Sequence, residues 1–326
     1  MTCTPTAPQP VRVVYKVLDG EEIDADVYLP EGQEEEAMNP ILINIHGGAH
    51  MLGSSSIISM DQVRDCLGRN WVVVAANHRL CPGVDILNGP MRDCRDLLAW
   101  IYDGKLATAL ADAGERNTRL DYDHVFAMGT SAGGHLALSL GFDVPRPVAG
   151  IYDMYGACDF SAPFWRNKVP HIAALIPKEV TESFTQQVYS QIPVPTKSRA
   201  SLEGHAVGKP DFTDPRQAFV MMQVANGRVL EALCPSGDFS RVDPLRNIGP
   251  DFPPTHIAHG VEDRNISIDA SRKLYRELQS KGVKCGMTEV PDEGHTFAAK
   301  MVPGSKTWDL QRRGFDFLQG LIVEKK

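Results

Sequence analysis

Runs of consecutive apolar residues alternate along this chain with stretches in which apolar residues recur at helical spacing. Six runs rich in β-branched side chains have the character of strands buried on both faces of a parallel sheet: residues 41–45, 71–76, 125–128, 148–152, 255–258 and 285–290. Before them, residues 11–17 and 24–29 flank the turn Asp19-Gly20, a pattern typical of a hairpin.

Amphipathic helices are predicted between and after these strands. Residues 91–102 repeat apolar side chains along one face, residues 268–280 end at Gly282, and residues 307–323 form a closing helix. Strands that alternate with helices in this way predict an α/β fold, with a mostly parallel central sheet flanked by helices.

One long segment interrupts the alternation, because no run between residues 160 and 250 is typical of a buried strand. It contains four helix-like patches separated by Pro- and Gly-rich loops: residues 170–175, 180–189, 215–224 and 228–233. Asp214-Pro215 has the pattern of a helix N-cap followed by proline at the first helical position. Because the segment is too long for a bare loop and only modestly apolar, we interpret residues 1–326 as a single domain with a helical lid inserted at residues 160–250.

Composition and charge narrow the classes of function. The 326 residues are 43% hydrophobic, enough for a large core, and their net charge of −8 comes without a Lys/Arg cluster, so neither nucleic acid nor an anionic membrane surface is expected as a partner. Residues 1–10 lack the pattern of a secretory signal, and no run approaches the roughly 18 apolar residues of a membrane span. The seven cysteines are scattered without C-x-x-C pairs, which favours reduced thiols in the cytoplasm over disulfides or a zinc site.

The pentapeptide G-T-S-A-G at residues 129–133 lies between a strand-like run and the helix-like run 135–140. A serine at such a strand-to-helix corner is held in a strained backbone conformation, and glycines two residues on either side avoid a clash. The corner exposes the hydroxyl group, and the helix directs N–H groups and its positive dipole end toward developing negative charge. Ser131 is therefore the candidate nucleophile, although a Gly-rich turn with an incidental serine would have the same pattern.

A serine nucleophile needs a neighbouring base, and an acid that orients the base. His295 lies in the loop after the last predicted strand, at the sheet edge where catalytic groups collect in open α/β folds. Asp263 follows the strand at residues 255–258, in the chain order Ser, acid, His expected of this architecture. Glu262 is adjacent and stays an alternative acid, whereas Asp269 is expected to cap the following helix.

Residues 46–53 form a loop of mostly small residues after the strand at 41–45, which we call the glycine loop. Its backbone N–H groups can approach a substrate oxygen closely, and the N–H of Ala132 is expected to supply a further donor. His46 and His50 have the spacing of a pair of metal ligands, but no acidic partner stands at ligand spacing, so no metal is expected. His46 is expected to brace the loop by a local hydrogen bond.

With these motifs the chain resembles the α/β-hydrolases over nearly its whole length, and among them the hormone-sensitive-lipase-like esterases. H-G-G-A at residues 46–49 is similar to their HGGG motif, and G-T-S-A-G-G at residues 129–134 to their G-D-S-A-G-G elbow. This resemblance implies an oxyanion hole formed by the N–H groups of Gly48, Ala49 and Ala132.

Other segments extend or modify the resemblance. N-H-R-L-C-P at residues 77–82 is similar to the family's Y-R-L-A-P segment, which implies that Arg79 braces the loop region. Thr130 replaces an acidic residue of the family, and His50 stands where an aromatic residue is common. The elbow is also similar to those of acetyl-xylan-esterase-like hydrolases and kynurenine formamidases.

We expect a serine hydrolase that cleaves a carboxylic ester of a small or medium-sized metabolite through an acyl-enzyme, without a cofactor. The same residues would serve a thioesterase, an aryl-amide or formamide hydrolase, or an acyltransferase. A non-catalytic ligand-binding protein on the same fold is the alternative of another class. The expected partner is a small-molecule ester or related acyl compound, and the protein is expected to be a monomer or a homodimer.

Large side chains of the predicted lid are candidates for an apolar substrate pocket, although each of them could instead pack the core of the lid. They are Phe160, Phe164, Trp165, Phe184, Tyr189, Phe219, Met221 and Met222. The adjacent methionines cannot both face the same way on a helix, so at most one of the two is expected to touch substrate.

Overall fold

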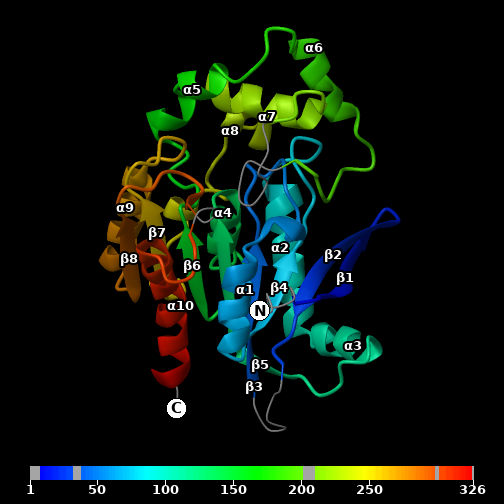
Figure 1. Cartoon of the computed structure of the whole chain (residues 1–326), viewed down its shortest axis with the longest axis vertical. Coiled ribbons are helices and arrows are strands. Elements are labelled where there is room, and N and C mark those ends of the chain that lie inside the picture. The colour runs from blue at the N-terminus through cyan, green and yellow to red at the C-terminus, as the bar shows by residue number, and fades with distance from the viewer. Residues whose placement is uncertain (1–7, 32–37, 201–209, 298–300, 325–326) are drawn as a thin grey trace, which may run out of the picture.

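The computed structural model of the chain describes residues 8–31, 38–200, 210–297 and 301–324. Within these ranges, eight strands form one sheet in the spatial order β1-β2-β4-β3-β5-β6-β7-β8 (Figure 1). The strands are β1 (Val11–Leu18), β2 (Glu21–Tyr28), β3 (Met38–Ile45), β4 (Val72–Ala76), β5 (Arg119–Thr130), β6 (Gly150–Met154), β7 (Thr255–Gly260) and β8 (Cys285–Val290). β2 is antiparallel to both of its neighbours, and all other pairings are parallel.

Helices cover both faces of the sheet and divide its core into two apolar layers. α1 (Met60–Gly68) and α10 (Lys306–Glu324) cover one face, where Trp71 packs between Phe126 and Phe315. The other layer lies under four helices: α2 (Arg92–Tyr102), α3 (Lys105–Asp112), α4 (Ala132–Ser139) and α9 (Ile268–Ser280). Burial of both faces explains why the parallel strands are continuous apolar runs in the sequence.

The predicted order of strands and helices is confirmed, with differences at the ends of elements. β3 and β5 are longer than predicted, because residues 38–40 pair with residues 119–121, which lie outside the continuous apolar runs of the sequence. The sequence carries little signal for α1 and α3, since each of these helices buries only two or three side chains. Ser267 caps α9, and its hydroxyl accepts the N–H of Asp269, so the prediction that Asp269 is the cap is wrong.

The chain between β6 and β7 is helical in its described part and lies at the end of the sheet where the glycine loop begins (Figure 1). Its helices are α5 (Pro170–Ala173), α6 (Glu182–Thr185), α7 (Pro215–Asn226) and α8 (Val229–Leu233), with 3-10 turns at Pro163–Arg166, Gln186–Ser190 and Pro244–Arg246. Asp214 caps α7 as predicted, because its carboxylate accepts the N–H of Arg216 at 2.9 Å. We call residues 160–250 the inserted segment, and its role as a lid stays a prediction.

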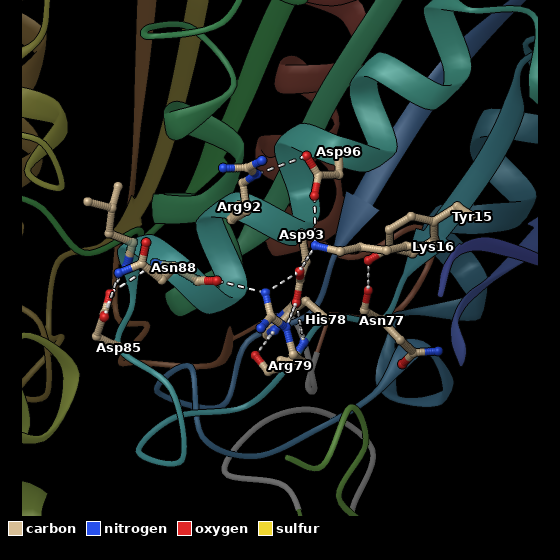
Figure 2. A network of polar contacts seen from close by, with 11 residues as sticks. Tyr15, Lys16, Asn77, His78, Arg79, Asp85, Asn88, Arg92, Asp93 and Asp96 are labelled. Carbon is tan, nitrogen blue, oxygen red and sulfur yellow. Dashed lines mark hydrogen bonds and ion pairs between the residues drawn. The ribbon is translucent and has the colours of Figure 1, made fainter. Parts of the chain in front are cut away.

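Asp93 is the centre of a polar network that supports the loop after β4 (Figure 2). Its buried carboxylate accepts a hydrogen bond from Lys16 Nζ at 2.6 Å. It also accepts the backbone and guanidinium N–H groups of Arg79 at 2.7–2.9 Å. The hydroxyl of Tyr15 donates to the carbonyl of Asn77 at 2.6 Å, so β1, α2 and the loop after β4 are joined. Arg79 thus has the contacts expected of a residue that braces this loop.

No helix in the described ranges combines the length and the apolar character needed to cross a bilayer. The six cysteines within those ranges have free thiols. Cys3 and residues 1–7, part of the segment used to argue against a secretory signal, lie outside the described residues.

Asp93→Asn is expected to lower the free energy of unfolding by about 3–5 kcal/mol, because it leaves the largely buried Arg79 without its counter-charge and Lys16 with Asp96 alone. Asp96→Asn is the matched control. The Asp96 side chain is 35% exposed and pairs with Lys16 and Arg92, so its loss is expected to cost less than about 1 kcal/mol. Urea unfolding of the three proteins measures both values, and equal losses would contradict the central role of Asp93.

Candidate active site

Ser131 occupies the sharp corner between β5 and α4. Its backbone has φ 53° and ψ −118°, a conformation that L-residues adopt only under constraint. The surrounding glycines make this corner possible, because a Cβ atom at Gly129 would overlap the backbone of Gly133. The predicted strand, strained turn and helix are therefore all present around Ser131.

The three residues predicted as a triad meet at one rim of the sheet. His295, in the loop after β8, has its Nε2 atom 3.0 Å from the Oγ atom of Ser131. Its Nδ1 atom lies 2.7 Å from Oδ2 of Asp263, which follows β7. Because Nδ1–H donates to the carboxylate, Nε2 is the nitrogen that can accept the hydroxyl proton of Ser131.

Asp263 is held as a carboxylate by four donors. Oδ1 accepts the backbone N–H groups of Asn265 and Ile266, and Oδ2 accepts from both His295 and His259. Burial by itself would raise the pKa of Asp263, but the charge of His295 and the hydrogen bonds from His259 and His295 outweigh it and hold the pKa well below its usual range.

Two residues beside Asp263 complete this part of the site. His259, which the sequence analysis did not select, is fully buried, with Nε2 3.0 Å from Asp263 and Nδ1 2.7 Å from the Ser271 hydroxyl. Its place at the end of β7, four residues before the acid, is the only signal that could have indicated it. Glu262 is exposed instead and lies outside the hydrogen-bond set of His295.

The glycine loop lies beside the nucleophile. Gly48, Ala49 and Ala132 line the same cavity as Ser131 and His295. Gly48 has φ 112°, and a Cβ atom there would overlap the carbonyl of Leu52, which requires glycine at this position. The three residues whose N–H groups are predicted to form the oxyanion hole therefore line the same cavity as the nucleophile.

The two histidines of the loop turn to different partners. Nδ1 of His46 donates to the carbonyl of Gly47 at 2.7 Å, the local hydrogen bond that was predicted, and its ring stacks on His78. His50 instead has Nε2 3.0 Å from Nδ1 of His135. Within the part of the chain that the structure describes, no group of three or more His, Cys, Asp or Glu side chains is placed to hold a metal ion.

A cavity of about 1040 Å³ opens onto Ser131, and the inserted segment forms much of its wall. Of the large side chains proposed for a pocket, four line it: Phe160, Phe164, Trp165 and Met221. Phe219 packs on Tyr189 instead, and Met222 lies outside the lining, which agrees with the expectation for adjacent methionines.

A second buried carboxyl group, Asp153, lies at the end of β6 against Gly134 of α4. Oδ1 accepts the N–H of Gly156 at 2.9 Å, and Oδ2 has no hydrogen-bond partner within the described residues. Burial raises the pKa of Asp153 to about 7, with the hydrogen bond from Gly156 opposing the shift. The folded protein therefore keeps a proton that the unfolded chain releases near pH 4.

Asp153→Asn removes this titration with little change of shape. From about pH 4 to pH 7 the unfolded wild-type chain loses a proton that the folded protein retains, so wild-type stability falls over this window and then levels off. The unfolding free energy of the variant minus that of wild type should rise by on the order of 4 kcal/mol between pH 4 and 8. Urea unfolding across this range tests it, and a pH-independent difference would exclude the proposed titration.

Two families match separate parts of the chain. Residues 25–175 match the family described as BD-FAE, and residues 225–323 match the prolyl oligopeptidase family. The first match contains the glycine loop and Ser131, and the second contains Asp263 and His295.

Curated relatives are much longer than this chain. The chain is 31% identical to the non-reducing polyketide synthase Preu6 of Preussia isomera, over 94% of this chain and 14% of the synthase. It is 28% identical to the non-reducing polyketide synthase trt4 of Aspergillus terreus, over 87% of this chain and 13% of that protein. The chain thus spans about one seventh of the length of these relatives.

Solved structures share the fold along nearly the whole chain. A thermophilic esterase of Thermogutta terrifontis with bound propionate superposes with a TM-score of 0.62 at 16% identity, covering 98% of this chain and 96% of that one. A Staphylococcus aureus protein of unknown function superposes with a TM-score of 0.67 at 18% identity, covering 95% and 99%. At such identity the likeness concerns the fold.

Proposed function

We propose that the chain, which has the α/β-hydrolase fold and matches the BD-FAE and prolyl oligopeptidase families over separate parts, is a serine hydrolase that cleaves a carboxylic ester of a small or medium-sized metabolite. The observation that carries the proposal is the line of contacts from Ser131 through His295 to Asp263, at 3.0 Å and 2.7 Å. The hormone-sensitive-lipase-like subtype stays a prediction from the motifs alone.

In this proposal Ser131 Oγ attacks the ester carbonyl while Nε2 of His295 takes the hydroxyl proton. The oxygen that becomes negative is stabilised by the N–H groups of Gly48, Ala49 and Ala132. The bond between the carbonyl carbon and the alcohol oxygen then breaks. His295 gives its proton to the leaving alcohol, and an acyl-enzyme remains. Water, deprotonated by the same imidazole, attacks the acyl-enzyme, and His295 gives the proton to Ser131 Oγ as the acid is released. Asp263 orients His295 and stabilises its charged form.

The size and lining of the cavity support the proposal that the substrate carries a large apolar acyl or alcohol group. Aromatic and aliphatic side chains of the inserted segment, among them Phe164, Trp165 and Leu230, line it together with the nucleophile. A largely apolar wall with a few polar groups near one end is typical of small-molecule sites. We therefore propose that the inserted segment acts as a lid that selects the substrate.

Cleavage of an acyl thioester by the same residues is the second candidate. The curated relatives are named as polyketide synthases, and a polyketide is an acyl chain, so this likeness favours an activated acyl group as substrate. The amide, formamide and acyl-transfer alternatives use the same residues, and a non-catalytic ligand-binding protein stays the alternative of another class. We propose action on a small molecule in the cytoplasm, as a monomer or homodimer and without a cofactor.

Ser131→Ala is expected to reduce kcat by more than about 10⁴-fold while the protein stays folded, because the attacking oxygen is lost. The assay compares a p-nitrophenyl ester with the thioester and the anilide of the same acyl group, and the substrate with the highest kcat/KM identifies the bond. Ser139→Ala is the control at the other end of the adjoining helix α4, where the hydroxyl donates to the carbonyl of Leu136. Turnover by the Ser131 variant at the wild-type rate would end the proposal.

Asp263→Asn is expected to reduce kcat by about 10³–10⁴-fold, since an amide cannot hold the imidazole in the required tautomer. Glu262→Gln tests the neighbouring carboxyl group and should leave kcat within about 3-fold of wild type, because Glu262 is exposed and the carboxylate of Asp263 is bonded to His295 at 2.7 Å. Steady-state kinetics of both variants on the preferred substrate decide which of the two carboxyl groups is the acid. A larger loss from the Glu262 variant would reverse the assignment of the acid.

A further inference from the structure

Three separate parts of the inserted segment reach the glycine loop. The backbone of Gly53 donates to the carbonyl of Ala200 at 3.1 Å and accepts the N–H of Ser198 at 2.9 Å. Arg216, at the start of α7, donates to the carbonyl of Met51 at 3.0 Å. The third link runs from Val242 through a pair of histidines. The inserted segment is thus bonded to the loop at several points along its length.

The histidine pair has a defined direction of hydrogen bonding. Nε2 of His135 lies 2.7 Å from the carbonyl of Val242, so it carries the proton and Nδ1 is an acceptor. Nδ1 of His135 then receives the Nε2–H of His50 in the glycine loop. Burial lowers the pKa of His135 to about 4 and that of His50 well below its usual range, so both rings are neutral at pH 7.

Arg216 makes the most concentrated of these links. One nitrogen of its guanidinium group donates to the carbonyls of both Met51 and Cys81, at 3.0 and 2.6 Å, and Nε donates to Gln191 at 2.8 Å. The N–H of Cys81 in turn donates to the carbonyl of His50 at 2.9 Å. Arg216 therefore holds the glycine loop directly at Met51 and indirectly at His50.

The placement of Arg216 is unusual for a charged residue. It is only 3% exposed, and no carboxylate pairs with it within the described residues. Burial lowers its pKa to about 10, against the opposing charge of Asp214, so it stays cationic at neutral pH. Burying an arginine against neutral carbonyls costs free energy, and a role in fixing those carbonyls accounts for its presence.

The glycine loop needs such external support because its backbone is strained. Ala49 and His50 have φ of 54° and 62°, in the left-handed region that is unfavourable for residues other than glycine. Strained residues of this kind persist where the surroundings impose them. The carbonyl of His50 is held by the N–H of Cys81, and the carbonyl of Met51 is held by Arg216.

We propose that Arg216 is a positioning residue for the oxyanion hole, so that the inserted segment sets the geometry of the N–H donors as well as the shape of the pocket. This inference rests on the proposed function. A misplaced donor weakens stabilisation of the transition state more than binding of the substrate. Arg216 therefore acts on kcat through the positions of Gly48 and Ala49, without touching substrate itself.

The test replaces Arg216 by Lys, which keeps the charge but has one flexible nitrogen in place of the planar fork whose two nitrogens reach Gln191 on one side and Met51 and Cys81 on the other. We expect kcat for the preferred ester to fall by about 10–100-fold with KM within 3-fold of wild type. Binding of a trifluoromethyl ketone, which forms an oxyanion on Ser131, should weaken by the same factor as kcat/KM. Arg241→Lys is the control, because that side chain is exposed in the inserted segment and pairs with Asp143.

The outcomes separate this inference from the proposed function. An inactive wild type would overturn the proposed function, whereas an active wild type with unchanged kcat and inhibitor affinity in a folded Arg216→Lys protein would overturn only the positioning role. If the lysine variant does not fold, Gln191→Leu decides. It removes one anchor of Arg216 outside the cavity lining and is expected to lower kcat by about 3–10-fold, and an unchanged kcat would again overturn the role.

Discussion

The close approach of α4 to the end of β3 is the constraint on which the site depends. A Cβ atom at Gly133 would overlap the carbonyls of Ile45 and His46, so only glycine lets the helix and the strand come this near. Ser131 precedes α4, and the glycine loop continues from β3. This one backbone contact therefore sets how far the nucleophile lies from the N–H groups that face the same cavity.

The buried polar groups near this contact are of two kinds, one charged and the other neutral. Asp263 keeps its negative charge because four N–H donors surround it, and that charge is directed at His295. His50 and His135 are buried without such a partner and stay neutral, so they serve as hydrogen-bonding spacers between backbone segments. The fixed charge of Asp263 therefore lies against His295, whereas His50 and His135 bond to each other and to a backbone carbonyl.

The inserted segment contacts this site in two ways, through apolar side chains and through polar groups. Its apolar side chains form much of the cavity wall, which favours substrates that leave water for an apolar surface. Its polar groups, above all Arg216, are bonded to the strained loop beside the nucleophile. A substitution in this segment would therefore affect both substrate selection and the chemical step. A flap that covers the site without bonds to the glycine loop would affect substrate selection alone.

The sequence by itself determined the strands, the elbow at Ser131 and the positions of Asp263 and His295. These features depend on local periodicity, short motifs and the rule that parallel strands collect their following loops at one edge. It could also separate Met221 from Met222, because neighbours on a helix face different ways. It did not identify His259 as a partner of Asp263.

Only the tertiary structure decided what supports the site. The contacts of Arg216 with Met51 and Cys81 join residues more than a hundred positions apart, and no local pattern distinguishes this arginine from an exposed one. The bond between His50 and His135, which are 85 positions apart, is likewise not indicated by any local pattern. Periodicity reports which face of an element is buried, whereas the partner of a buried polar group is set by how distant segments pack.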